Sequence, residues 1–118
     1  MKDKIIYLET KGKKYPMCFN LNVMEVIQDK YGSLNAWSGL IEPEEGEPNI
    51  KALKYGFTQM LNEAIDIENE EKGENKPFLT LKQVGRLISE IGFEEVTRKI
   101  VSLSVASTNT GDNEGKNE

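Results

Sequence analysis

Carboxylates are the side chains best able to do chemistry in this 118-residue sequence, because it has no histidine and only one cysteine, Cys18. Zinc sites built from cysteine and histidine, Ser-His-Asp triads and Cys-His dyads all need residues that the chain lacks. A lone cysteine also excludes a disulfide scaffold. Cys18 lies in the apolar stretch 15–19, where an inert buried thiol and a reactive thiol both remain open.

The clearest alternation of oxygen ligands is Asp66-Ile67-Glu68-Asn69-Glu70, which resembles the start of a calcium-binding loop. Such a loop needs glycine at its sixth position and glutamate at its twelfth, where this chain has Glu71 and Pro77. The sequence also has no glycine-rich phosphate loop and no carboxylate beside a nucleophile and apolar pocket residues. We therefore expect no metal, no cofactor and no enzymatic activity.

Residues 80–104 contain a predicted helix, a turn at Gly92 and a second predicted helix, the order found in helix-turn-helix DNA-binding proteins. The second helix begins with Glu94-Glu95, and the chain has a formal net charge of −5, so phosphate would be repelled. A packed helical hairpin explains the same pattern. A small transcriptional regulator that uses residues 80–104 is kept as the alternative function.

Two short amphipathic segments are candidates for a protein-binding surface. The first, 33–41, contains the only tryptophan, and aromatic anchors are favoured in protein interfaces. The second, 93–103, continues an apolar stripe beyond Gly92. Tryptophan at this position fits either the core or an interface. The candidate partner-binding residues are Trp37, Leu40, Ile41, Phe93, Val96 and Ile100.

A β-hairpin is predicted over residues 4–19. Residues 4–10 are rich in β-branched and aromatic types, residues 11–13 supply a turn, and residues 14–19 form the second strand. Pro16 cannot donate to a ladder, so this strand should be an edge strand or irregular.

Helix boundaries follow from capping residues. Asn22 with Glu25 has the spacing of an N-cap and its partner, which predicts a helix from Asn22 to Tyr31, before Gly32. Ser33 can cap a short helix that ends before Pro43.

The longest apolar pattern runs from Ile50 to Ile67 after Asn49, and Gly56 inside it marks either a close approach of another helix or a tolerated glycine. Thr80 and Gln83 form a second capping-box spacing.

Charge divides the chain. Residues 42–77 carry a net charge of −6, mostly in the runs 42–48 and 68–74, which are typical of solvated linkers. Residues 107–118 have no large apolar side chain, so we expect a disordered polar tail. Residues 1–106 then form a single compact domain, with helices within 22–106. The prediction is an α+β, predominantly α fold: an N-terminal β-hairpin followed by four to five packed helices.

Membrane and export signals are not apparent in the sequence. The apolar runs are far shorter than the roughly 20 residues that a membrane helix needs. The first residues do not have the pattern of a secretory signal. We expect a cytoplasmic protein that binds neither membrane nor nucleic acid.

The order of these features resembles the tail assembly chaperones of long-tailed bacteriophages and prophages of Gram-positive bacteria. The hairpin that ends in Tyr15-Pro16-Met17 is followed by a helix and by the turn Tyr31-Gly32-Ser33-Leu34, which carries most of the resemblance. A long helix from Asn49, the segment Leu79 to Val84, a final helix and a polar tail complete it.

The resemblance implies a non-enzymatic protein of the bacterial host cytoplasm, with no catalytic residues to carry over. It would bind and solubilise the tape measure protein, help recruit the major tail protein, and be open to self-association. Many family members also exist in a longer, frameshifted form. A tape measure protein exposes apolar helical stripes, which helices cover by laying an apolar face against them. Segments 33–41 and 93–103 are the candidate surface for this contact.

Overall fold

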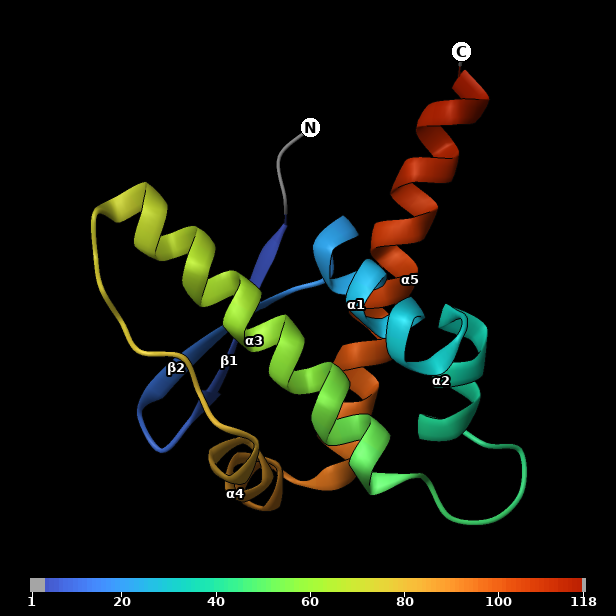
Figure 1. The fold of residues 1–118 in the computed structure, drawn as a ribbon, viewed down its shortest axis with the longest axis horizontal. Helices are drawn as coiled ribbons and strands as arrows, with labels where there is room; N and C mark the ends of the chain where they lie inside the picture. The colour runs from blue at the N-terminus through green and yellow to red at the C-terminus, as the bar shows by residue number, and fades with distance from the viewer. Residues whose placement is uncertain (1–3, 118) are drawn as a thin grey trace.

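The structure is a computed structural model that describes residues 4–117, with side chains described as far as residue 105. In that range a two-stranded antiparallel hairpin precedes five helices, which confirms the predicted fold class (Figure 1). The tail expected at 107–118 lies outside the residues whose side chains are described, and it stays a prediction. The elements are β1 (Ile5–Thr10), β2 (Lys13–Cys18), α1 (Leu21–Tyr31), α2 (Leu34–Ile41), α3 (Ile50–Lys72), α4 (Leu81–Ile91) and α5 (Phe93–Asn117).

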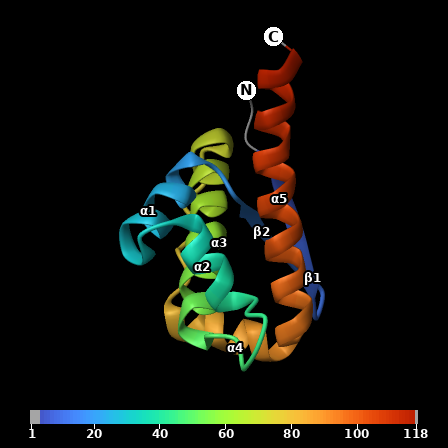
Figure 2. The same ribbon diagram turned by 90° about the vertical axis from the view of Figure 1, so that its right-hand side faces the viewer.

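Helix α3 packs against β2, α1, α2 and α4. Figure 2 shows α5 standing beside the group of α1, α2 and α3, with α4 at their base. Side chains of α3 that are fully buried include Leu53, Phe57, Met60 and Leu61, so this helix supplies the centre of the core. No helix in the described part of the chain is long and apolar enough to cross a membrane.

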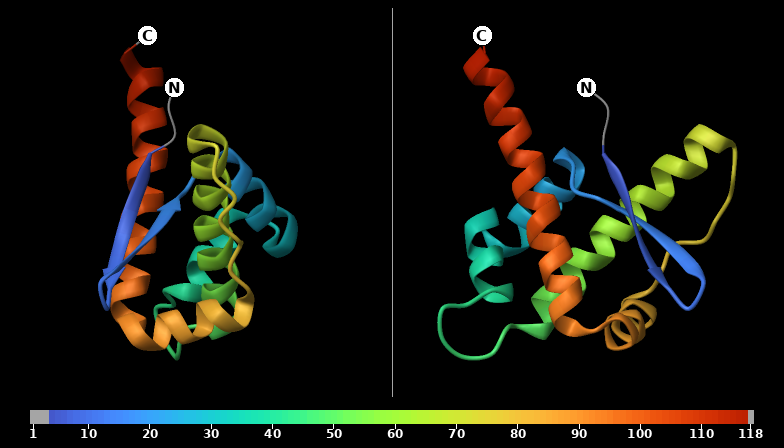
Figure 3. Two further views of the ribbon diagram at one scale, coloured as in Figure 1. Left: turned by 90° about the vertical axis from the view of Figure 1, so that its left-hand side faces the viewer. Right: turned by 180° about the vertical axis from the view of Figure 1, so that it is seen from behind.

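The hairpin is closed by a two-residue turn, Lys11-Gly12, in which both residues have positive φ. This geometry matches the natural twist of paired strands and favours glycine. Pro16 pairs with Tyr7 in the register, and it is tolerated because a two-stranded sheet has only edge strands. β2 packs on α3, as the views in Figure 3 show, and both Met17 and Cys18 are fully buried. The buried-thiol interpretation of Cys18 is therefore the one observed.

The predicted N-cap of the first helix was wrong by two residues. Helix α1 begins at Leu21, and the side chain of Asn20 accepts a hydrogen bond from the backbone N–H of Val23 at 3.1 Å. Asn22 instead lies in the first turn, where its amide donates to Glu63 of α3 at 3.0 Å. Both asparagines suit a cap and both donate to Glu63, Asn20 at 2.8 Å, so local sequence does not show which of them caps the helix.

The other boundaries agree with the predicted caps. Ser33 caps α2, Asn49 caps α3, and Thr80 with Gln83 forms a reciprocal capping box at α4. Helices α1 and α4 are each followed by a glycine with positive φ, Gly32 and Gly92. Such residues let the chain reverse direction without a side-chain clash.

The two acidic runs have different structures. Residues 42–48 form an exposed connection without helix or strand, as expected of a solvated linker. Residues 68–72 belong to α3, so the linker prediction for 68–74 was wrong there. Glu68 is only 3% exposed, although its neighbours in sequence suggest a surface position.

Candidate functional site

The six predicted partner-binding residues do not form one exposed patch. Leu40 and Phe93 are half-buried, and the other four lie in the core. Those four are Trp37, Ile41, Val96 and Ile100. The two segments that carry the six residues nevertheless lie on either side of a single surface hollow.

Trp37 lies in the core, which is one of the two placements, core or interface, that the sequence left open. It is 2% exposed, and its indole Nε1 donates to the backbone carbonyl of Ala52 at 3.0 Å. A Cβ atom built on Gly56 would lie 2.3 Å from Cζ2 of the indole, so only glycine admits the ring. The close-approach interpretation of Gly56 is therefore confirmed. The ring also stacks on Phe19, with centroids 6.4 Å apart.

The hollow, which we call the α2–α5 cleft, lies between the end of α2, the connection that follows it and the first turns of α5. It has a volume of about 490 Å³. Its lining is mainly apolar, with carboxylates at the edge. The lining residues are Ile41, Glu42, Pro43, Gly46, Pro48, Phe93, Glu94, Thr97, Arg98, Val101 and Ser102.

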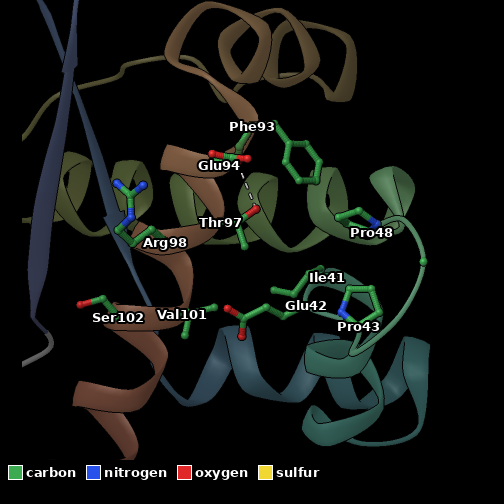
Figure 4. A pocket seen from close by; sticks show the side chains of 11 residues that line it. Ile41, Glu42, Pro43, Pro48, Phe93, Glu94, Thr97, Arg98, Val101 and Ser102 are labelled. Atoms are coloured by element: carbon green, nitrogen blue, oxygen red, sulfur yellow. Dashed lines mark hydrogen bonds between the residues drawn. The ribbon is translucent and has the colours of Figure 1, made fainter.

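The two walls of the cleft present apolar groups to each other. Figure 4 shows Phe93 and Val101 of α5 on one side, with Pro43 and Pro48 of the connection on the other. Ile41 lies between these walls, and only 1% of it is exposed. The cleft can therefore hold an apolar side chain from another molecule against a floor that already belongs to the core.

Local hydrogen bonds fix the wall of the cleft that is formed by the end of α2 and the connection 42–48. Helix α2 ends at Ile41, where the backbone N–H of Glu42 bonds to the carbonyl of Ser38, and Pro43 cannot continue the helix. The backbone N–H of Asn49 then donates to the carbonyl of Leu40 at 2.8 Å. This bond joins the two ends of the connection and makes it a closed loop.

The wall of the cleft that is formed by α5 depends on the turn at Gly92. Its φ of 112° lets α4 end and α5 begin within one residue. Along α5, Val96, Ile100 and Leu103 face the core. Phe93 and Val101, two turns apart, face the cleft with Thr97 between them. Val101 lies beside the core stripe and is not among the predicted partner-binding residues, although the spacing of 93, 97 and 101 indicates that it shares a face with Phe93.

The rim of the cleft is acidic on balance. The carboxylate of Glu42 projects from the end of α2 toward α5, and Glu94 lies in the first turn of α5 (Figure 4). Arg98 points away from the apolar groups and forms an ion pair with Glu95. Its positive charge is thus partly neutralised, and an approaching segment would meet uncompensated negative charge.

The buried carboxylate of Glu68 is a second cluster that the sequence did not reveal. The hydroxyl of Tyr7 in β1 donates a hydrogen bond to one carboxylate oxygen of Glu68, and the Lys76 ammonium lies 2.9 Å from the other. Lys72 is 3.7 Å away on the next turn of α3. The cluster joins β1, α3 and the segment that leads to α4. Both carboxylate oxygens of Glu68 accept hydrogen bonds from other elements, so the cluster fastens these three elements together.

Burial alone would raise the pKa of Glu68. Hydrogen bonds from Tyr7 and Lys76, together with the charges of Lys76 and Lys72, outweigh burial and hold the pKa of Glu68 below its ordinary value. The hydrogen bond that each of them donates to Glu68 raises the pKa of Tyr7 and the pKa of Lys76. All three shifts favour a charged carboxylate at neutral pH.

The cleft combines an apolar lining with carboxylates and hydroxyl groups. The hydroxyl of Thr97 donates to the backbone carbonyl of Phe93 at 3.0 Å, so it is committed within its own helix. Among the residues whose side chains are described, no three acidic or cysteine side chains come together as a metal site would require. The arrangement offers an apolar surface with a charged edge.

Comparisons with protein-family models, with curated proteins and with solved structures gave no match.

Proposed function

We propose that this chain is a non-enzymatic tail assembly chaperone of a long-tailed bacteriophage or prophage. It would act in the cytoplasm of the bacterial host, bind the tape measure protein, keep it soluble and help recruit the major tail protein. The proposal rests on the resemblance described above and on one observation of the structure. That observation is the α2–α5 cleft, which joins the two segments expected to contact a partner.

The cleft suits an amphipathic helix better than a small polar ligand. Phe93 and Val101 can receive apolar side chains spaced along one face of a helix, the mode used by helix-in-groove interfaces. The carboxylates of Glu42 and Glu94 stand at the edge, so a helix with lysine or arginine beside its apolar stripe would be favoured. Tape measure proteins are expected to expose such stripes before they are packaged in a tail.

The alternative of a helix-turn-helix regulator has less support. The first turn of α5 carries Glu94 and Glu95, at the end of the helix where a DNA reader contacts bases. The acidic loop 42–48 lies beside that same turn. Both would repel the phosphate backbone.

Coexpression tests the proposed function. The tape measure protein of the same phage or prophage is produced with and without this chain, and its soluble fraction is measured. We expect a clear rise in soluble tape measure protein and copurification of the pair. A tape measure protein that stays insoluble, with nothing copurifying, would contradict the proposal. Binding of the chain to duplex DNA, weakening steeply with salt, would favour the regulator instead.

A further inference from the structure

A second apolar hollow lies on the other side of the first turns of α3. Its volume is about 370 Å³, and it is bounded by the end of α1 and the start of α4. We call it the lysine pocket. It is lined by Lys30, Ile50, Lys51, Lys54, Tyr55 and Leu81. The chain as a whole has a formal net charge of −5, whereas the three lysines give this hollow a local positive charge.

The lysines of this pocket have no anionic partner among the described residues. Lys30 approaches aromatic rings only, with its Nζ 5.0 Å from the ring centre of Tyr55. The apolar lining is also open, because Ile50 is 51% and Leu81 is 52% exposed. Uncompensated cations around exposed apolar side chains favour a partner surface that is both apolar and acidic.

This chain itself carries such an acidic surface next to the pocket. Loop 42–48 leads directly into α3, and its ends are held together by the bond between Asn49 and Leu40 (Figure 1). Glu44, Glu45 and Glu47 are exposed on it and form no ion pair with a described residue. A loop closed in this way loses little conformational entropy when it binds.

We propose that a second copy of this chain docks on the lysine pocket through a two-fold contact. The exposed Ile50 and Leu81 of the two copies would face each other, and each loop 42–48 would lie against the lysines of the other copy. A two-fold contact requires a surface that is complementary to itself. Acidic and basic patches that adjoin at one end of α3 meet this requirement, with an apolar centre and a charged rim.

Nucleic acid fits the pocket less well than a second copy. A phosphate backbone would have to lie over exposed Ile50 and Leu81, and it would approach the carboxylates of loop 42–48. Loop 42–48 takes part in both proposals, because the dimer contact uses its exposed carboxylates and the α2–α5 cleft is lined by its Pro43, Gly46 and Pro48. The two proposals are tested at different residues, the lysines of the pocket and Val101 of the cleft, so they can fail independently.

Sedimentation velocity over a concentration series tests the contact with the full chain. At low salt we expect a reversible dimer that weakens as salt is added. The variants K51E/K54E and E44K/E45K should each weaken dimerisation about tenfold or more, because attractive charge pairs become repulsive at both symmetric contacts. An equal mixture of the two variants should restore the dimer, since one contact of the mixed dimer keeps the wild-type charge pairs and the other has them swapped, so opposite charges meet at both.

The matched control is K13E/K14E, which makes the same change of charge at exposed lysines of the hairpin. It should dimerise like the wild type, and circular dichroism checks that every variant is folded. A wild-type chain that stays monomeric at all concentrations overturns the proposal. So does a control that weakens the dimer as much as K51E/K54E, or a mixture of folded variants that fails to associate. Binding of DNA by these lysines without dimerisation assigns the pocket to another occupant and also overturns it.

Discussion

Helix α5 presents one face to the core and another to the α2–α5 cleft, whereas the last residue of α2, Ile41, belongs to both the core and the cleft floor. On the core side, Trp37 fills the space above Gly56 completely, and Val96 and Ile100 are fully buried. On the cleft side, Phe93 and Val101 are only half-buried and meet no side chain that fills the hollow. The difference indicates that the core packing of α5 and the surface that we propose for a partner lie on different faces of the helix, so substitutions should be able to separate them.

The core face should give the largest effect. Replacing Trp37 by alanine removes a buried ring and leaves the Ala52 carbonyl without its indole donor. We expect the free energy of unfolding to fall by about 3–5 kcal/mol, measured by urea denaturation. A loss well below 1 kcal/mol would mean that Trp37 is not packed as described, and the distinction between the two faces would fail.

Gly56→Ala tests the same packing from the other side. The added methyl would lie inside the indole of Trp37, so we expect a loss of about 1–3 kcal/mol through overpacking. Gly39→Ala in α2 is the matched control, because no neighbouring atom lies within 4 Å of its added Cβ. That control should be neutral or slightly stabilising. Equal effects of the two substitutions in thermal unfolding would show that helix propensity, and not the contact with Trp37, decides.

Glu68→Gln tests the polar fastening at the far end of α3. Because the pKa of Glu68 is lower in the folded chain than in the unfolded chain, the unfolded chain binds more protons in acid. The stability that the carboxylate contributes is present above its ordinary pKa and is lost as pH falls through the folded pKa.

At neutral pH we expect E68Q to lose about 1–2 kcal/mol, the range of a hydrogen bond to a charged group. Below about pH 4 the difference from the wild type should shrink. Urea denaturation across this pH range measures it, with exposed Glu70→Gln as the control. A difference that does not depend on pH would contradict the ionised state of Glu68.

The smallest effect is expected at the start of α1. Asn20→Ala removes the N-cap and the hydrogen bond to Glu63, and should cost about 1 kcal/mol. Asn22→Ala removes only an exposed hydrogen bond to the same carboxylate and should cost less. Chemical denaturation of the two variants side by side decides, and a larger loss for N22A would restore Asn22 as the cap.

Most of the helix boundaries could be predicted from local sequence. Ser33, Asn49 and the pair of Thr80 and Gln83 cap helices where their spacing indicated, because capping depends on residues within one turn. Glu68 escaped prediction because its partner Tyr7 is 61 residues away, and nothing in a run of glutamates distinguishes the one that is buried.

The candidate site was predictable only in part. Segments 33–41 and 93–103 do border one cleft, but the most apolar positions in them lie in the core. The positions left for a partner are those beside the core stripe, such as Val101. Finding them requires knowing which direction each helix faces, and this is set by tertiary packing.

The most direct test of the central claim compares copurification of the tape measure protein with three variants of the chain. Val101→Glu places a charge in the cleft, Glu42→Lys reverses the rim, and Ser89→Glu adds the same charge as V101E on an exposed face of α4. The free energy of unfolding of each variant must first lie within about 1 kcal/mol of the wild-type value, as is usual for substitutions outside the core.

We predict that V101E and E42K lose the tape measure protein and that S89E retains it at the wild-type level. Normal copurification by folded V101E and E42K would contradict the account and place the binding surface elsewhere.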